Sequence, residues 1–338
     1  MRRPPAVARV LERATATSRT HHLFLPNQTA LLAVSGGPDS VCLAETMVRL
    51  RRLLKVRLEI VHVDHGMREG SRQDAAYVRR LADRLRLPVH VRTLEESPPV
   101  GASAEAWLRE RRRFAIAEVA REVDAGRIVT AHTLDDQAET VLMRLLTGSG
   151  ATGVAGIRYH AGPYVRPLLD VTRAEVEDCC RSLGLRPRRD PTNDDPSYAL
   201  RNALRLQAIP ALERAVGRGV KEPMARSAAL LAADDAELTR QMLLVWDDAF
   251  EETEGGADLR AVVLLGLPRP IATRLVAQAI FRCASSVSRA DVEAVLDLAA
   301  GRPGRRRDLS AGLKARRDRE YVRIASPVRT DRTEGTDP

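Results

Sequence analysis

The sequence predicts an α/β protein: a parallel, Rossmann-like sheet domain followed by a smaller, mostly helical C-terminal domain. Short apolar, β-branched runs alternate with longer helical patterns through the first half of the 338-residue chain. Strands and helices that alternate in this way form a parallel sheet whose crossover helices cover its faces. After residue 162 this alternation ends, and helical patterns dominate from about residue 216 onward.

Each element follows from its own hydrophobic pattern. Short apolar runs predict strands at residues 31–34, 58–63, 89–91 and 128–131. Longer patterns with helical spacing predict helices at residues 41–54, 74–87 and 104–123. Thr172 and Glu175 have the spacing of a capping box, which predicts that another helix begins there. The last predicted strand covers residues 320–324.

The changes of pattern predict the domain organisation. Residues 1–215 are expected to form the first domain and residues 216–325 the helical second domain. Residues 326–338 are polar, and we expect them to be a disordered tail.

The net charge of +9 is compatible with a polyanionic partner such as nucleic acid. Nearly all of the positive charge is arginine, because Lys55, Lys221 and Lys314 are the only lysines. Charge alone therefore leaves a second interpretation open, an arginine-rich composition inherited from a genome rich in G and C.

The cysteine and hydropathy patterns favour a cytoplasmic protein. The four cysteines contain no CxxC pair, which favours reduced thiols. The N-terminal segment lacks the apolar core of a signal peptide, and no window of 18 apolar residues suggests a membrane span.

The segment SGGPDS, residues 35–40, lies between the first predicted strand and the first predicted helix. Gly36 and Gly37 allow backbone N–H groups to approach an anion closely, and the following helix adds its N-terminal dipole. Ser35 and Ser40 supply hydroxyl donors. Because the loop has no lysine, the phosphate charge requires a metal ion, which Asp39 is placed to help bind. The alternative is an ordinary turn in which Asp39 only caps the helix.

Polar residues also follow the other predicted strands. Asp64 and His65 end the second strand, and His132 ends the fourth. Ligands of open parallel sheets bind beyond the carboxyl ends of the strands. The sequence therefore predicts a phosphate-ligand site at this edge.

Four stretches carry a resemblance to a known family. SGGxDS resembles the pyrophosphate loop of the N-type ATP pyrophosphatases, the PP-loop superfamily. Three further stretches resemble segments of the tRNA(Ile)-lysidine synthetases: VHVDHGMREGSRQDAAYV (61–78), AHTLDDQAETVLMRLLTGSGATGVAG (131–156) and RRDPTNDDPSYALRNALR (188–205). Together they occur in order across residues 30–205, and the chain is identified as a member of that family.

The resemblance implies a reaction and its partners. The family ligates free lysine to carbon 2 of the first anticodon cytidine of tRNA(Ile) with a CAU anticodon. ATP and Mg²⁺ serve the reaction, an adenylated cytidine is the intermediate, and AMP and pyrophosphate are released. The product reads the codon AUA instead of AUG. The first domain would be catalytic and the second would bind tRNA, with a homodimer left open and no membrane partner.

The resemblance also implies residue roles. The ATP-binding residues would be Ser35, Gly36, Gly37, Pro38, Asp39, Ser40, Asp64, His65 and His132. The tRNA-binding residues would be Arg109, Arg112, Arg201, Asn202 and Arg205. The catalytic residues would be Asp39, Asp136, Arg112 and Arg205. Asp136 and Glu139 would bind lysine, and Asp39 and Asp136 would bind Mg²⁺.

Simpler interpretations remain for several of these residues. Asp135 and Asp136 begin a predicted helix, where carboxylates interact favourably with the dipole in any protein. Glu139 could belong to a surface ion pair, and the arginines could form a solvated face. Thr133 stands where the family's AHHxDD segment has a second histidine.

The chemistry of lysine adds one requirement. An amine of pKa about 10.4 is neutral in only about one molecule in two thousand at pH 7, so a base must accept its proton. Asp136 is the candidate base. The alternatives to lysidine synthesis are a tRNA sulfur-transferase, a glutamine-fuelled synthetase and a non-catalytic RNA-binding relative.

Overall fold

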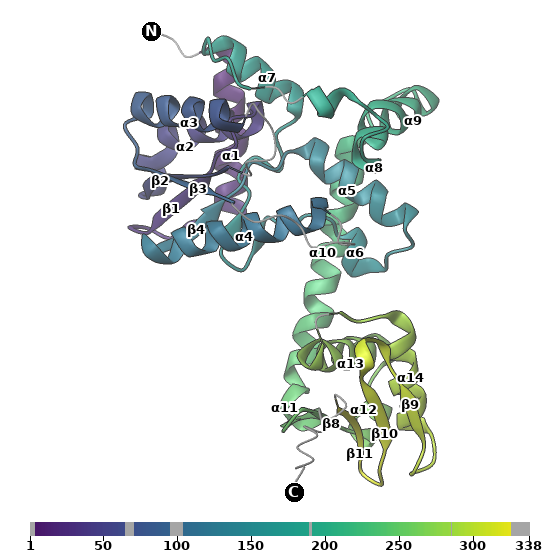
Figure 1. Ribbon diagram of the computed structural model, residues 1–338. Helices are drawn as coiled ribbons and strands as arrows, with labels where there is room; N and C mark the ends of the chain where they lie inside the picture. Colours follow the sequence, from purple (N-terminus) through teal and green to yellow (C-terminus); the bar gives the residue numbers. More distant parts are fainter. Residues whose placement is uncertain (1–3, 65–70, 95–103, 189–190, 285, 326–338) are drawn as a thin grey trace, which may run out of the picture. The chain divides into compact units, whose positions relative to one another are not determined.

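The computed structural model describes residues 4–64, 71–94, 104–188, 191–284 and 286–325 (Figure 1). The chain divides into two compact units, residues 1–232 and residues 233–338, which are described separately. The predicted tail, residues 326–338, lies outside the described residues.

A six-stranded sheet forms the centre of the first unit, in the order β3-β2-β1-β4-β6-β5. All neighbouring strands are parallel except β5, which runs antiparallel to β6. The strands are β1 (Thr29–Ala33), β2 (Arg57–Asp64), β3 (Val89–Thr93), β4 (Ala125–Val129), β5 (His160–Ala161) and β6 (Tyr164–Val165).

The helices of this unit connect and cover the strands. They are α1 (Pro5–Thr20), α2 (Pro38–Leu54), α3 (Ser71–Leu85), α4 (Ala104–Glu122), α5 (Leu134–Leu146), α6 (Ala151–Val154), α7 (Arg173–Ser182), the 3₁₀ turn η1 (Pro191–Asp194), α8 (Leu200–Ala203) and α9 (Ile209–Val216). A further helix, α10 (Lys221–Leu244), begins in this unit and continues into the next.

Alternating side chains of the central strands bury the two faces of the sheet. On one face, strand residues such as Leu32 and Ile60 share a core with α1, α2, α3 and α7. On the other face, Leu31, Val61 and Ile128 pack against α4. This three-layer arrangement leaves the carboxyl edge of the parallel strands as the place where the connecting loops converge.

The segment 200–216 is helical throughout, but its hydrogen-bonding pattern changes at residues 204–208, a π-helical stretch labelled η2 (Leu204–Ala208). Pro210 follows this stretch and cannot donate a backbone hydrogen bond. A widened turn ahead of the proline accommodates its ring, as is common at kinks.

The second unit has its own core, built from helices and an antiparallel sheet in the order β7-β8-β11-β10-β9. Its helices are α11 (Trp246–Ala249), α12 (Ala261–Gly266), α13 (Arg269–Cys283) and α14 (Arg289–Ala300), with a 3₁₀ turn η3 (Ser310–Gly312). Its strands are β7 (Phe250–Thr253), β8 (Gly256–Arg260), β9 (Arg306–Asp308), β10 (Lys314–Arg317) and β11 (Tyr321–Ala325).

The predicted α/β fold class is confirmed, and every predicted strand and helix of the first half is present with small shifts at its ends. The expectation for the C-terminal region included only one strand of its five-stranded sheet, at residues 320–324. The units divide at residues 232 and 233, within α10, compared with the expected division after residue 215. Among the described residues, no helix is long and apolar enough to cross a membrane.

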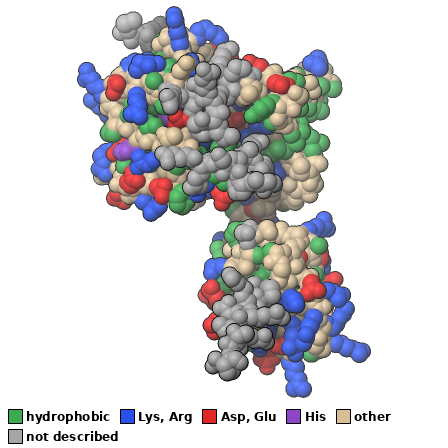
Figure 2. Space-filling model, in the orientation of Figure 1, with side chains coloured by type: hydrophobic (Ala, Val, Ile, Leu, Met, Phe, Trp, Pro, Cys, Tyr) green, Lys and Arg blue, Asp and Glu red, His purple; other side chains and the backbone are tan. Residues whose placement is uncertain are grey.

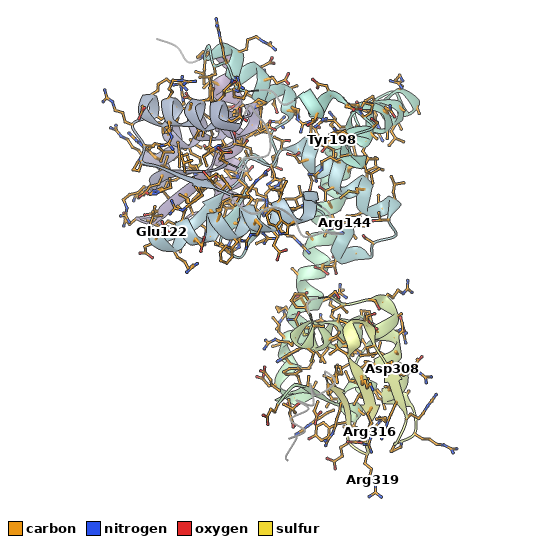
Figure 3. All side chains as sticks on the ribbon, in the orientation of Figure 1. Glu122, Arg144, Tyr198, Asp308, Arg316 and Arg319 are labelled. Atoms are coloured by element: carbon orange, nitrogen blue, oxygen red, sulfur yellow. The ribbon has the colours of Figure 1, made fainter. Side chains whose placement is uncertain are left out.

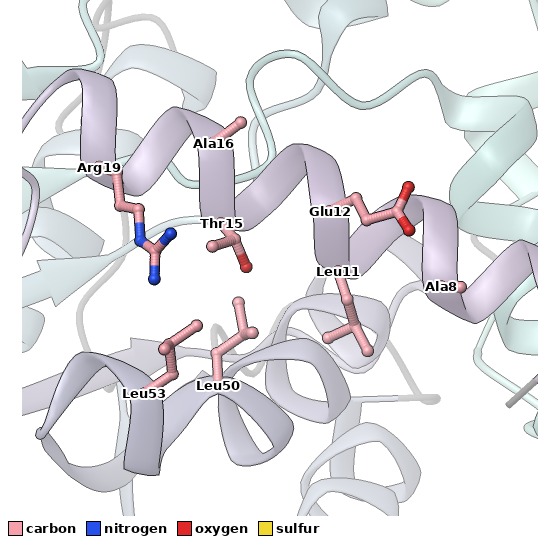
Figure 4. Close-up of a pocket in the computed structure, with 8 residues that line it drawn as sticks. All are labelled: Ala8, Leu11, Glu12, Thr15, Ala16, Arg19, Leu50 and Leu53. Carbon is pink, nitrogen blue, oxygen red and sulfur yellow. The ribbon is translucent and has the colours of Figure 1, made fainter.

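A shallow depression of about 400 Å³ lies between α1 and α2 (Figure 4). Leu11, Leu50 and Leu53 line it, and Glu12 and Arg19 extend from α1 beside them. None of the predicted site residues borders this depression.

Candidate active site at the carboxyl edge of the parallel sheet

The loop between β1 and α2 is organised by its two serines. The Ser40 hydroxyl accepts hydrogen bonds from the backbone N–H groups of Ser35 and Gly36, both at 3.2 Å, and donates to the Gly37 carbonyl at 2.9 Å. Gly36 has a φ of +94°, a conformation that favours glycine. Because α2 begins immediately afterwards at Pro38, the loop presents a helix N-terminus to the carboxyl edge of the sheet.

Asp39 lies in the first turn of α2, facing the interior. Its Oδ1 atom is buried and has no hydrogen-bond partner among the described residues. Burial raises the pKa of Asp39 to about 6; Arg173 opposes this shift, and Asp136 and Asp135 add to it. A buried carboxylate oxygen without a partner next to a phosphate-type loop fits a cation ligand better than a simple helix cap.

Thr133 and Asp136 form a capping box at the start of α5. The backbone N–H and the hydroxyl of Thr133 donate to Asp136 Oδ2 at 2.8 and 3.0 Å, and the Asp136 N–H donates to the Thr133 hydroxyl at 3.4 Å. The Thr133 side chain is completely buried. Thr133 therefore caps the helix at the position where the resembled segment has a histidine, and one oxygen of Asp136 is occupied by the cap.

Asp135 is held by two partners from distant segments. Its Oδ2 accepts from the Arg173 backbone N–H at 2.8 Å, and its Oδ1 accepts from Lys221 Nζ at 2.6 Å. Burial opposes ionisation, but these hydrogen bonds outweigh it and lower the pKa of Asp135. Asp135 thus joins α5 to α7 and α10 through these two hydrogen bonds.

Glu139 is the most enclosed carboxylate of the site, with a side chain only 1% exposed. Arg173 Nη1 lies 3.5 Å from Oε1 and Arg201 Nε lies 3.4 Å from Oε2, although neither carboxylate oxygen makes a hydrogen bond within the part of the chain that the structure describes. Burial and the neighbouring Asp136 raise the pKa of Glu139 to about 7, against the opposing charges of Arg173, Arg201 and Arg205. The predicted surface-pair alternative is therefore wrong for this residue.

Arg173 is a site residue that the sequence did not reveal. It is the first residue of α7, and its guanidinium contacts Asp136 Oδ1 at 3.4 Å in addition to Glu139. Burial disfavours its charge, but Asp136, Asp39 and two further carboxylates outweigh this and raise the pKa of Arg173. The only sequence signal was its place directly after the helix cap Thr172.

His132 and Asp64 lie at the ends of β4 and β2 as predicted, whereas His65 lies outside the described residues. The Nδ1 atom of His132 is 3.0 Å from the Thr130 hydroxyl. Burial and nearby arginines, opposed by Asp136, lower the pKa of His132 to about 4, so its imidazole is neutral at pH 7. His62 was not among the predicted site residues. It is buried on β2, and its Nδ1 donates to the Val34 carbonyl at 2.8 Å, next to the start of the loop.

Asn202 and its neighbouring arginines have different surroundings. Asn202 is buried, and its side-chain amide donates to the carbonyls of Thr192 and Asp195 at 2.8 and 2.9 Å. Arg205 Nη2 donates to Asn202 Oδ1 at 3.2 Å, while Arg201 Nη2 donates to the Thr140 hydroxyl at 3.0 Å. Arg201 thus extends to α5, whereas Asn202 fixes the turn that precedes it.

Arg109 and Arg112 are exposed on α4. The charge of Arg109 contributes to lowering the pKa of His132, so this arginine acts on the same edge of the sheet. The structure therefore brings the loop, the α5 carboxylates and His132 together with Arg201, and it adds Arg173 and Lys221 to the predicted set.

Comparisons with known proteins identify the family. Residues 9–212 match the family described as a PP-loop domain. The tRNA(Ile)-lysidine synthase of Symbiobacterium thermophilum is 40% identical over 290 residues, which cover 82% of this chain and 60% of that protein. The chain therefore spans less than two thirds of this relative's length. The synthase of Thermobifida fusca is 39% identical over 275 residues, covering 81% of this chain and 82% of that protein.

The chain belongs to the tRNA(Ile)-lysidine synthase family. The predicted family is thereby confirmed, and the PP-loop domain supports the use of ATP. Among solved structures, the U34-tRNA thiolase NcsA from Methanococcus maripaludis, described with its [4Fe-4S] cluster, has a TM-score of 0.58 at 18% identity. That likeness covers 67% of this chain and 79% of the thiolase, and it shows the fold alone.

Proposed function

We propose that this chain ligates lysine to carbon 2 of the first anticodon cytidine of tRNA(Ile) with a CAU anticodon. The reaction passes through an adenylated cytidine and releases pyrophosphate and AMP. One observation carries the proposal: a phosphate-type loop and the buried carboxylate Glu139 are gathered around Arg173 at one edge of the sheet. Such a site has a place for ATP and a place for an amine, in a chain of the lysidine synthase family.

The first half-reaction is assigned to the loop after β1. The target cytidine leaves the anticodon stack, which costs a few kcal/mol, so that its O2 atom can attack the α-phosphorus of ATP. The start of α2 and the Gly37 N–H, whose bond to the Ser35 hydroxyl is long at 3.4 Å, stabilise the departing pyrophosphate, while the Gly36 N–H is held by Ser40. Ser40, which is buried, keeps the loop in shape by bonding three backbone groups.

We assign magnesium binding to Asp39 and Asp136, the two carboxylates expected to hold the ion. Mg²⁺ sites in nucleotide enzymes commonly use one or two carboxylates together with substrate phosphates. Two oxygens fit that donor set: Asp39 Oδ1, which has no partner among the described residues, and Asp136 Oδ1, which lies outside the capping box and 3.4 Å from Arg173 Nη2. Among the described residues, no group of three or more histidine, cysteine, aspartate or glutamate side chains could hold a metal without other ligands. The ion would neutralise charge on the phosphates.

The second half-reaction is assigned to Glu139 rather than to Asp136 alone. The lysine side-chain amine must lose a proton before or as it attacks carbon 2 of the adenylated cytidine. Glu139 has a pKa of about 7, close to the working pH, whereas one oxygen of Asp136 is committed to the helix cap. We therefore assign proton acceptance to Glu139 and orientation of the ammonium group to Asp136.

The second unit is proposed to bind the tRNA body. Figure 2 shows Lys and Arg side chains on its visible face. Exposed basic residues include Arg306, Arg307, Lys314, Arg316 and Arg319. Arg316 and Arg319 belong to β10 and the turn after it (Figure 3). Contacts of this type bind backbone phosphates and position the RNA without reading its sequence.

The test is transfer of labelled lysine to a tRNA(Ile) transcript with a CAU anticodon, in the presence of ATP. A tRNA(Met) transcript and a transcript with the target cytidine changed to uridine are the controls. We expect label only on the first transcript, stable to mild alkaline deacylation because it is not an ester. Absence of label while ATP still binds would contradict the proposal and favour the sulfur-transferase or the RNA-binding alternative.

A further inference from the structure

A group of arginines beside the α5 carboxylates has no role in the steps above. Arg166 follows β6, and β6 pairs with β4 in parallel, with Val165 opposite Val129. The Thr130 N–H donates to the Val165 carbonyl at 3.0 Å, which continues the pairing beyond the strands. Arg166 and His132 therefore leave the same carboxyl edge of the sheet from neighbouring strands.

The Arg166 side chain is anchored but incompletely paired. Its Nη1 donates to the Arg158 carbonyl at 2.6 Å, and its backbone N–H donates to the Tyr159 carbonyl at 3.0 Å. Its Nε is buried and has no hydrogen-bond partner among the described residues. A buried guanidinium N–H without an acceptor is costly, and an oxygen of a bound ligand would satisfy it.

Helix α4 brings further positive charge to this place. The Tyr164 hydroxyl donates to the Arg113 carbonyl at 3.5 Å, and the Arg113 guanidinium lies 5.3 Å from the centre of the Tyr164 ring. Arg109 precedes Arg113 by four residues, so both lie on one face of the helix. Burial and the charges of Arg113 and Arg109 lower the pKa of Arg166, which shows that these like charges are close enough to repel.

No carboxylate offsets this repulsion in the described part of the chain: Arg109, Arg113 and Arg166 are absent from its ion pairs with Asp and Glu. An arginine fork matches the oxygens of a phosphate group, and a bound anion would relieve the repulsion and satisfy the free Nε.

We propose that Arg166, together with Arg109 and Arg113, forms a phosphate-binding site at the carboxyl ends of β4 and β6. The loop after β1 lies two strands away in the order β1-β4-β6, about 10 Å at the usual strand spacing. The phosphate bound here is therefore an RNA backbone phosphate next to the extruded cytidine, rather than the pyrophosphate end of ATP. This assignment rests on the proposed function and adds Arg166 and Arg113 to its RNA-binding residues.

The test compares the full chain with the variants Arg166→Gln, Arg166→Lys and Arg113→Gln. Arg121→Gln is the matched control, an exposed arginine near the other end of α4. Binding of the tRNA(Ile) transcript is measured by fluorescence anisotropy over a series of salt concentrations, and ATP binding is measured by calorimetry. Arg113 is exposed, so its substitution tests the site even if Arg166→Gln does not fold.

We expect each Gln variant to weaken tRNA binding by about ten- to a hundredfold, the range for a hydrogen bond to a charged group. The slope of log affinity against log salt should fall by about 0.7 to 0.9 for the lost phosphate contact. Arg166→Lys should keep that slope, and Arg121→Gln should bind as the wild type does.

The outcomes separate the sources of the phosphate. A loss of ATP affinity with unchanged tRNA affinity would keep the phosphate site but assign it to ATP. Unchanged affinity for both ligands in Arg166→Gln and Arg113→Gln would overturn the inference. Failure of the wild-type chain to bind the transcript at all would contradict the proposed function itself, and with it the RNA assignment.

Discussion

The guanidinium of Arg173 lies 3.5 Å from the carboxylate of Glu139, whose side chain is only 1% exposed. Arg173 comes from the first turn of α7 and Glu139 from the second turn of α5, so two helix starts meet at this contact. The same arginine also contacts Asp136, so it pairs with both carboxylates assigned to lysine.

Substitution of Arg173 should shift the pH dependence of lysine transfer. Arg173→Met removes a cation that lowers the pKa of Glu139, so that pKa should rise by about one unit. The acid limb of the pH–rate profile for lysine transfer should move to higher pH by the same amount. Arg181→Met, an exposed position on the same helix, is the control. An unshifted acid limb in Arg173→Met would disprove the coupling.

The raised pKa of Glu139 should also make the stability of the protein depend on pH. A carboxyl whose pKa rises from 4.5 to about 7 on folding binds protons more tightly in the folded state, so stability falls as pH rises between these values. The free energy of unfolding of wild type should fall relative to Glu139→Gln by about 3 kcal/mol between pH 4 and pH 8. Urea unfolding at both pH values checks this difference, and a pH-independent difference would refute it.

Thr133→Val should destabilise the first unit, because the valine cannot accept the Asp136 N–H or donate to the Asp136 carboxylate. The loss of an N-cap costs about 1 kcal/mol, up to about 2. Thr133→Ser keeps the hydroxyl and should lose much less. The measurement is the unfolding free energy in urea. Equal stability of the Val and Ser variants would show that the capping box contributes nothing.

Gly36→Ala should weaken ATP binding, since the loop requires a φ of +94° at this residue. Alanine is strained at this φ and should change the shape of the loop; moving one loop N–H away from a charged phosphate, about 1.5–3 kcal/mol, weakens binding by about tenfold or more. Gly148→Ala is the control, because Gly148 also has positive φ and open space around it. Calorimetry with ATP separates the two variants. Equal ATP affinities in both would mean that Gly36 serves only the fold.

The central sheet could be predicted because its strands are buried on both faces and therefore read as continuous apolar runs. The second sheet could not be predicted in this way. Strand β10 reads as KARR, yet Arg317 is buried there, and its guanidinium donates to the backbone carbonyls of Ala299 and Tyr321. A charged residue that is satisfied by distant carbonyls carries no strand signal in the sequence.

The site was predictable where a local motif sets the geometry, as in the loop at residues 35–40 and the helix start at Asp135 and Asp136. It was not predictable where the packing of distant elements determines which side chains meet. Arg173 reaches the carboxylates only because α7 packs against α1 and α2, and Asn202 binds two carbonyls of its own chain. The role expected for Asn202 in binding tRNA remains a prediction, but its amide group is already occupied.

The most direct test of the account is to separate the two half-reactions in the variant Glu139→Gln. The chain is incubated with the tRNA(Ile) transcript, lysine and ATP labelled at its α-phosphate. We expect labelled, adenylated tRNA to accumulate without lysidine, because the loop after β1 is intact and the proton acceptor is missing. Lysidine formed at the wild-type rate by Glu139→Gln would contradict the account.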